Sequence, residues 1–314
     1  MSDIVAISFI YQFYPPRMQS SYTATTFLPI ALSVIMLGLG LSLQVSDFTR
    51  ILKFPKAVFV GLFCQMFLMP VICFFVTKAF SLSPQMAVGM MLLAASPGGA
   101  VANLYSHLSR GDVALNITLT ATNSLLTLFT IPLIVSLSLQ YFLEEGQYIP
   151  MQFKKIMEVF MLVFIPVAAG MFIKKHFPEL SDRLSKPVKI TSAFFLAAVV
   201  IAATYQEKEK LYEYFIQVGV AALVFNIISL ALGYFLPRLA RLSKRESIAI
   251  GMEIGIHNGT LAIFLAVNVL SAPVMAIPAA VYSLLMFFTA AVFGWLVNQT
   301  NTASYKSAFT RHRN

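Results

Sequence analysis

The residues of this sequence best suited to chemistry lie in one short stretch of an apolar segment. Between Gly251 and Thr260, a carboxylate, an imidazole, an amide and three glycines occur within ten residues. Glu253 is the only acidic residue deep inside an apolar run, where an unpaired charge is costly, and no Lys or Arg lies at a comparable depth. The sequence therefore predicts that a bound cation or a proton accompanies Glu253. His257 follows four residues later and would share the face of Glu253 if the helix continued.

Neutral side chains that carry oxygen recur in other apolar runs. One helical face has polar residues at spacings of four, three and four. This face consists of Asn116, Thr120, Asn123 and Thr127. Gln65 and Asn103 add two amides elsewhere. Hard cations such as sodium prefer oxygen ligands of this kind, and a sodium site is therefore suggested for Gln65, Asn103, Asn116, Thr120 and Glu253. Hydrogen bonding between helices is the alternative role of such a face.

Two long apolar runs contain residues that interrupt helices. Segment 96–100 reads Ser-Pro-Gly-Gly-Ala, and segment 254–259 reads Ile-Gly-Ile-His-Asn-Gly. Proline removes a backbone donor and glycine lowers helix propensity, so both runs are predicted to be broken helices. The N–H groups at a half-helix start suit an anion, and the carbonyls at a half-helix end suit a small cation. Packing kinks are the alternative, but the corresponding positions of the two breaks favour an inverted-repeat transporter.

The composition indicates that a membrane surrounds these runs. Of the 314 residues, 58% are hydrophobic and only 11% are charged, whereas soluble domains have about 25% charged residues. Nine apolar runs are long enough to span a bilayer, and in lipid such runs must be helices. The runs are 25–45, 56–78, 85–109, 112–142, 151–174, 188–205, 211–236, 247–270 and 274–298.

The Lys and Arg residues predict the orientation of the chain. When alternate loops are assigned to the two sides, sixteen basic residues share the side of the first loop and six lie on the other. The basic side faces the cytoplasm, so we expect an external N-terminus and a cytoplasmic C-terminus in a bacterial inner membrane. These loops account for the net charge of +9, and no nucleic-acid partner is expected.

Four motifs resemble, in order along the chain, those of the bile acid:sodium symporter family. They are Met36-Leu-Gly-Leu-Gly-Leu41, Pro97-Gly-Gly99 with Asn103, Ser109-Arg-Gly-Asp-Val-Ala-Leu115 and Glu253-Ile-Gly-Ile-His-Asn-Gly259. The resemblance covers 25–298 and is to a bacterial member, similar to homologues of the apical sodium-dependent bile acid transporter. It implies a six-helix core domain, in which the two broken helices cross, and a panel domain built from the remaining helices.

The resemblance also implies where ligands bind. The positions that match a first sodium site are Ala102, Asn103, Asn116, Thr120 and Glu253. Those that match a second are Gln65, Glu253, His257 and the backbone carbonyls of Ile254 and Ile256. The anion is expected at the half-helix starts, at Gly98, Gly99, Ala100, Asn258, Gly259 and Thr260. The family usually has a hydroxyl residue at position 102, serine at 116 and glutamine at 257, so the number of sodium ions is left open.

Together these observations predict an all-α polytopic membrane protein with about nine transmembrane helices. An extracytoplasmic segment 1–24 precedes a first repeat of four helices at 25–142, a second repeat of five at 143–300 and a cytoplasmic tail at 301–314. The predicted function is sodium-coupled symport of an organic anion, bile-acid-like or a small carboxylate, by a monomer in the lipid bilayer without a cofactor other than the coupling ion. Proton-coupled anion transport and cation/proton antiport are the alternatives. An enzyme is not expected, because His257 lacks catalytic companions.

Overall fold

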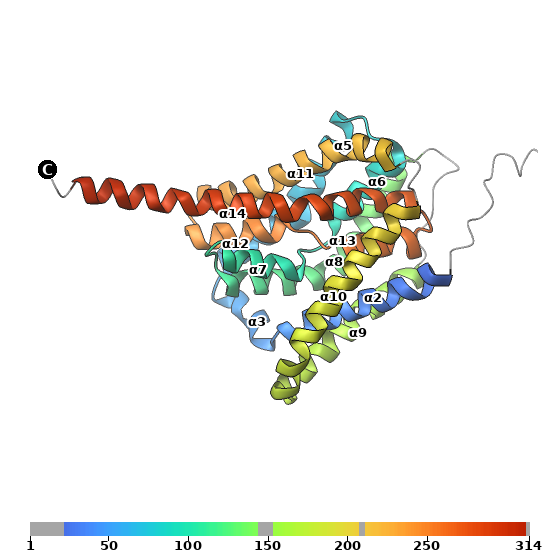
Figure 1. The fold of residues 1–314 in the computed structure, drawn as a ribbon, viewed down its shortest axis with the longest axis horizontal. Coiled ribbons are helices and arrows are strands. Elements are labelled where there is room, and N and C mark those ends of the chain that lie inside the picture. The colour runs from blue at the N-terminus through green and yellow to red at the C-terminus, as the bar shows by residue number, and fades with distance from the viewer. Residues whose placement is uncertain (1–21, 144–152, 207–210, 312–314) are drawn as a thin grey trace, which may run out of the picture.

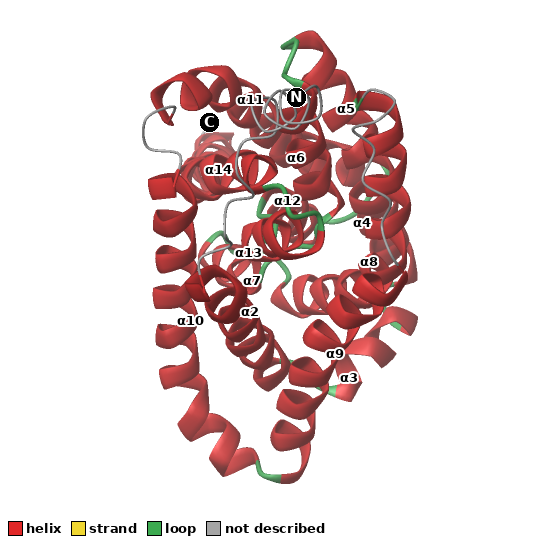
Figure 2. Ribbon diagram, turned by 90° about the vertical axis from the view of Figure 1, so that its right-hand side faces the viewer, coloured by secondary structure: helices red, strands yellow, loops and turns green. Residues whose placement is uncertain are grey.

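The computed structural model describes residues 22–143, 153–206 and 211–311, which are almost entirely helical (Figure 1, Figure 2). The predicted helical class is therefore confirmed. The predicted segment 1–24 falls, up to residue 21, outside the described residues.

The first half of the chain forms seven described α-helices. They are α2 (Tyr22–Ser42), α3 (Val45–Thr49), α4 (Pro55–Phe63), α5 (Met69–Ala79), α6 (Pro84–Ala95), α7 (Ala100–Leu108) and α8 (Val113–Phe142). A 3-10 turn, η1 (Arg50–Leu52), follows α3. A π-helical turn, η2 (Cys64–Leu68), joins α4 to α5, so that the chain is helical from Pro55 to Ala79.

The second half adds six α-helices. They are α9 (Phe153–His176), α10 (Pro178–Gln206), α11 (Leu211–Leu239), α12 (Lys244–Gly255), α13 (Gly259–Phe264) and α14 (Ile277–Arg311). A π-helical turn, η3 (Leu265–Val269), and a 3-10 turn, η4 (Pro273–Ala276), connect α13 to α14. Helix α10 begins ten residues before the predicted run, because Pro178 occupies a helix start that its fixed φ favours.

Each of the nine predicted runs coincides with helix, and the third and eighth are broken as expected. The breaks are shorter than predicted, at 96–99 rather than 96–100 and at 256–258 rather than 254–259. By length and apolarity, three helices of the described residues qualify as complete spans, Pro55–Ala79, Phe215–Leu239 and Pro273–Gln299, and two bent pairs would raise the number to five. Helices that are interrupted or that carry polar residues do not meet these criteria of length and apolarity, so the number of nine spans stays a prediction.

The two breaks cross at the centre of the molecule, where their loops meet (Figure 2). Gly98 and His257 form an antiparallel bridge. The backbone N–H of Gly99 donates to Ile256 O at 2.9 Å, and that of Asn258 donates to Pro97 O at 2.9 Å. Each break thus pairs backbone groups that the other leaves without helical partners, which is how irregular backbone is tolerated in a membrane interior.

The chain before each crossing segment repeats the same local features 160 residues apart. Ser81 and Arg241 both have positive φ after a helix end. Ser83 and Ser243 then hold the N-cap positions of α6 and α12, which are both twelve residues long. Ser243 completes a capping box with Glu246, which satisfies two backbone donors at the start of α12.

Most of the described helices pack in two groups. Helices α2, α9 and α10 contact one another extensively, and they lie together on one side in Figure 1. The second group surrounds the crossing and contains the helices from α4 to α8 and from α11 to α14. Contacts of α8 with α3 and α9 join the groups at one end, and contacts of α13 with α2 and α10 join them at the centre.

Candidate cation and substrate site

Glu253 lies in the last turn of α12, directly beside the crossing. Its side chain is completely buried. Thr120 Oγ1 donates to Glu253 Oε2 at 2.6 Å, and Asn123 Nδ2 donates to Glu253 Oε1 at 2.9 Å. Both donors come from the polar face of α8, which therefore points into the protein. Neither donor carries a positive charge, and no ion pair of the described residues includes Glu253.

Three amide oxygens on the two helices that pack against this part of α12 are buried without a hydrogen-bond donor. They belong to Asn103, Asn116 and Asn123. The Nδ2 group of Asn116 donates to Ala249 O in α12 at 2.8 Å, which fixes the amide at the α8–α12 contact. Asn103 comes from α7, a helix that packs against both α8 and α12. Unpartnered buried acceptors are uncommon, and oxygens beside a carboxylate are the donor set that a hard cation accepts. These residues therefore fit sodium.

Gly98 is required by its closeness to the acid. A Cβ atom at this position would overlap the carboxylate of Glu253. At Gly99 the nearest atom to an added Cβ would be His257 O at 3.7 Å, an ordinary contact. The first glycine therefore allows the crossing to approach Glu253, whereas the position of the second has room for a Cβ atom.

His257 and Glu253 do not share a helical face, because α12 ends at Gly255 between them. The imidazole instead turns toward α6. Its Nδ1 lies 3.2 Å from Ser96 O and 3.5 Å from Gln65 Nε2. Gln65 Nε2 donates to the same Ser96 O at 2.9 Å. The structure therefore brings Gln65 and His257 together, apart from the hydrogen bonds of Glu253.

The carbonyl end of α12 has two partners that sequence reasoning missed. Gly255 O accepts hydrogen bonds from Asn226 Nδ2 at 2.8 Å and from Tyr282 Oη at 2.9 Å. Both side chains are completely buried. The amide of Asn226, in the middle of the apolar run of α11, was the available signal, since a buried amide without a partner would be costly.

The positions predicted for the anion are tightly packed at the second break. Asn258 caps α13 by accepting from Leu261 N at 3.0 Å. A Cβ at Gly259 would overlap Ser283 Oγ, and Thr260 is buried. At the first break, the N–H of Gly99 is used in the crossing, and α7 begins at Ala100. The structure thus brings these six residues together but fills the space around Gly259.

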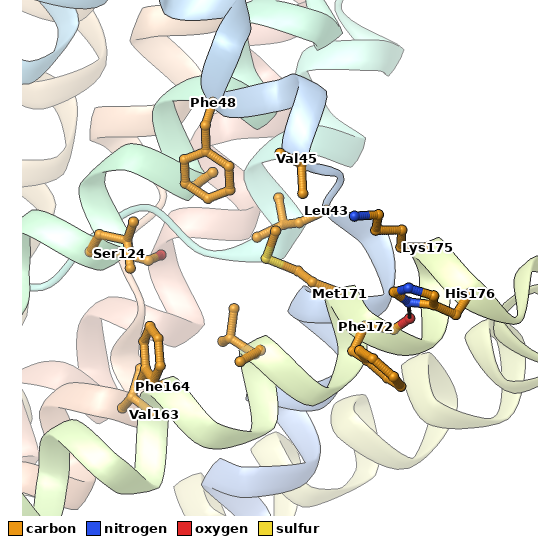
Figure 3. A pocket seen from close by; sticks show the side chains of 14 residues that line it. Leu43, Val45, Phe48, Ser124, Val163, Phe164, Met171, Phe172, Lys175 and His176 are labelled. Atoms are coloured by element: carbon orange, nitrogen blue, oxygen red, sulfur yellow. Dashed lines mark hydrogen bonds between the residues drawn. The ribbon is translucent and has the colours of Figure 1, made fainter.

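A cavity of about 450 Å³ lies instead between α3, α8 and α9, beside the loop that follows the end of α2 (Figure 3). Most of its walls are apolar. The lining residues are Leu43, Val45, Phe48, Ala121, Ser124, Leu125, Val163, Phe164, Val167, Ala168, Met171, Phe172, Lys175 and His176. None of them is acidic. Lys175 and His176 lie together at one end of the cavity, away from Ser124 and Phe164 (Figure 3).

The polar end of the cavity has an available positive charge. Lys174 forms an ion pair with Asp182 at 2.8 Å, whereas no ion pair in the described part of the chain includes Lys175. The opposite wall belongs to α8, where Ala121 and Ser124 line the cavity. Thr120 and Asn123 on the same turns hold Glu253. One helix therefore separates the cavity from the carboxylate and contacts both.

Comparison with known proteins identifies the family of the chain. Residues 29–214 match the model of the sodium bile acid symporter family. The chain is 29% identical over 258 residues to the probable sodium/metabolite cotransporter BASS1 of Arabidopsis thaliana, covering 81% of this chain and 62% of that protein. It is 27% identical to the sodium-dependent transporter YocS of Bacillus subtilis, covering 82% and 79%. It is 26% identical to the human ileal sodium/bile acid cotransporter, covering 77% and 69%. The chain therefore belongs to the sodium bile acid symporter family.

Proposed function

We propose that the protein is a secondary transporter that couples the uptake of an organic anion to sodium. One observation carries this proposal. Glu253 is buried beside the crossing, no cationic side chain pairs with it among the described residues, and nearby amide oxygens lack donors. A buried carboxylate in these surroundings is stabilised by a small cation. The names of the relatives, all described as sodium-dependent transporters or cotransporters, support the choice of sodium.

In this proposal the cation adds a shared ligand to helices that already pack against one another. Sodium bound at Glu253 would take the free oxygens of Asn103, Asn116 and Asn123 as further ligands. These groups lie on α7, α8 and α12, so the ion would connect both broken helices to α8. The family has a hydroxyl residue at the position of Ala102, whose side chain offers no oxygen. In this proposal the amide oxygens take the place of that hydroxyl as ligands.

We place the anion in the cavity between α3, α8 and α9. Its apolar walls suit the body of an organic anion, and Lys175 offers a positive charge without an ion-pair partner at one end. The half-helix starts predicted for the anion lie at the crossing, and none of them lines this cavity. The cavity lies at the ends of α2 and α9 that the Lys and Arg distribution assigns to the cytoplasm.

Alternating access would then be a movement of the α2–α9–α10 group against the helices around the crossing. The features repeated 160 residues apart support an internal duplication, with repeats at 25–142 and 143–300. The other parts of the proposal are nine spans, a monomer, a bacterial inner membrane, an external N-terminus and a cytoplasmic C-terminus. Proton coupling at Glu253, as symport or antiport, is the alternative coupling.

The test measures the melting temperature of the purified full-length protein in sodium, potassium and choline chloride at equal ionic strength and at pH 5.5 to 8. A ligand that binds only the folded state stabilises it by about 2.7 kcal/mol at a hundred times Kd. We expect sodium alone to raise the melting temperature and Glu253→Gln to abolish this rise. Glu246→Gln is the matched control, because it lies in the same helix and glutamine keeps the capping box. A response to pH through Glu253, without a response to sodium, would establish proton coupling instead.

A further inference from the structure

The ends of half-helices α6 and α12 are the other place at the crossing where a cation would seek oxygen. A broken helix leaves carbonyls without partners there, and a small cation commonly fills the gap. In α6, Ser96 O already accepts from Gln65 Nε2 at 2.9 Å and faces His257 Nδ1 at 3.2 Å. Gln65 Nε2 also lies 3.3 Å from Ala94 O. Two side chains therefore cap this end of the helix.

The end of α12 is capped in the same way. Gly255 O accepts from both Asn226 Nδ2 and Tyr282 Oη. Ile256 O accepts from the backbone N–H of Gly99 in the other broken helix. Protein N–H and O–H groups thus occupy Ser96 O at the end of α6, and Gly255 O and Ile256 O at the end of α12. This lowers the affinity of these carbonyls for a cation.

The orientation of the Gln65 amide supports this reading. Turning the amide over would point its oxygen at Ala94 O and Ser96 O, two further acceptors, so the hydrogen-bond network selects the observed orientation. The acceptors left over are Gln65 Oε1, Asn226 Oδ1 and His257 Nε2. None of the three is negatively charged, and an imidazole nitrogen is a poor ligand for a hard cation.

The charges of the described residues also indicate a single cation at the crossing. The buried carboxylates are those of Asp47 and Glu253. Asp47 pairs with Arg50 at 2.8 Å, which leaves Glu253 alone without a cationic partner. One monovalent cation neutralises one carboxylate, and a second would be an uncompensated charge in a buried place.

We propose that the crossing binds one sodium ion, at Glu253, and that side-chain caps on both half-helix ends exclude a second. This inference rests on the proposed function. A monovalent organic anion would then cross the membrane together with one sodium ion, and the cycle would move no net charge. Gln65, His257 and the carbonyl group of Ile256, which match the second sodium site of the family, are here structural rather than ligands.

The test counts sodium directly. Binding of radioactive sodium to the purified full-length protein is measured by equilibrium dialysis, with choline chloride keeping the ionic strength constant and without an anion substrate. We expect one sodium per chain, a Hill coefficient of about 1, and no specific binding to Glu253→Gln. Two sodium ions per chain, or a Hill coefficient well above 1, would overturn the inference but leave the proposed function standing. Absence of specific sodium binding to the wild type would overturn both.

A variant separates a cap from a ligand. Gln65→Met keeps the length of the side chain and removes its hydrogen bonds to Ala94 O and Ser96 O. We expect its sodium Kd to stay within about twofold of the wild type, while the melting temperature falls. A loss of affinity of tenfold or more would identify Gln65 as a ligand and reject the inference. If the variant does not fold, the count on the wild type still decides.

Discussion

The two broken helices share one backbone design but differ in the chemistry that they carry. Half-helices α6 and α12 have the same length, and each follows a serine N-cap and a residue with positive φ. The tenth residue is Leu93 in α6 and Glu253 in α12, and both side chains are completely buried. The same place in the two helices therefore holds a hydrocarbon in one and a carboxylate in the other.

This difference indicates what each half contributes. The first break supplies close backbone, since Gly98 approaches the acid of the second break. The second break supplies the charge, and α8 supplies its hydrogen-bond donors. The half-helix ends are treated alike, because an amide caps each of them, Gln65 in one and Asn226 in the other. The backbone is thus duplicated, whereas the cation chemistry is found once among the described residues.

The largest effect is expected from a substitution that blocks the close contact of the first break with Glu253. Gly98→Ala places a methyl group where the carboxylate of Glu253 lies, so the crossing must open or the acid must turn away. Overpacking of this kind costs about 1–3 kcal/mol, and we expect the sodium-induced rise in melting temperature to disappear. Gly99→Ala meets nothing closer than 3.7 Å and should retain both stability and the sodium response.

Comparing the two variants also tests the role given to each glycine. Gly98 and Gly99 are neighbours in the same break, and glycine is lost in both variants, so a general loss of backbone freedom would affect them equally. Equal loss of the sodium response would show that flexibility matters rather than space. A normal sodium response in Gly98→Ala would place the cation away from the carboxylate contacted by this glycine.

A smaller effect on sodium binding is expected from removing one of the α8 side chains that contact the Glu253 carboxylate. Thr120 and Thr118 are both completely buried, and each donates to a carbonyl four residues earlier. Only Thr120 also reaches Glu253. We expect Thr120→Val to weaken sodium binding by about tenfold, the effect of losing one charge-assisted contact of roughly 1.4 kcal/mol. Thr118→Val should leave the sodium affinity unchanged in the same titration of melting temperature, and equal effects would contradict the assigned geometry.

The features predicted from the sequence are those with a local physical signal. Pro97 and the glycines beside it disrupt a helix wherever they stand, and an acid such as Glu253 is conspicuous in an apolar run. The polar spacing on α8 predicted an inward face, yet Asn123 was left out of the predicted ligands, since which residue of the face meets Glu253 depends on how α8 packs on α12.

Other features depend on the packing of distant segments and had no such signal. Tyr282 lies 27 residues from its partner Gly255, in a run where one tyrosine among apolar residues is ordinary. The cavity combines residues from the loop after α2 and from α3, α8 and α9, and no spacing in the sequence marks these as neighbours. The orientation of His257 also had no signal in the sequence, because it depends on α12 ending at Gly255, before this residue.

Removing a cap from the end of α12 should lower the stability of the fold without changing the affinity for sodium. Tyr282→Phe removes the hydroxyl that donates to Gly255 O and accepts from Asn226 Nδ2. Loss of these bonds should lower the free energy of unfolding by about 1–3 kcal/mol, whereas the sodium Kd should stay the same. Tyr105→Phe is the control, because the ring of Tyr105 stacks on Phe287 and its hydroxyl makes no hydrogen bond among the described residues. A changed sodium Kd in Tyr282→Phe would mean that the two ends of the crossing are not independent.

The smallest effect is expected at the mouth of the cavity, and it separates the anion from the cation. Lys174 and Lys175 are adjacent at the end of α9, but Lys174 is paired with Asp182 and only Lys175 lines the cavity. We expect Lys175→Gln to weaken binding of a steroid carboxylate about two- to fivefold, since exposed charge pairs contribute little. Lys174→Gln should have no such effect, and neither variant should change the sodium Kd. Because α8 forms the wall between the cavity and Glu253, a sodium Kd that shifts in Lys175→Gln without any anion present would show that this charge acts through α8 rather than on the anion.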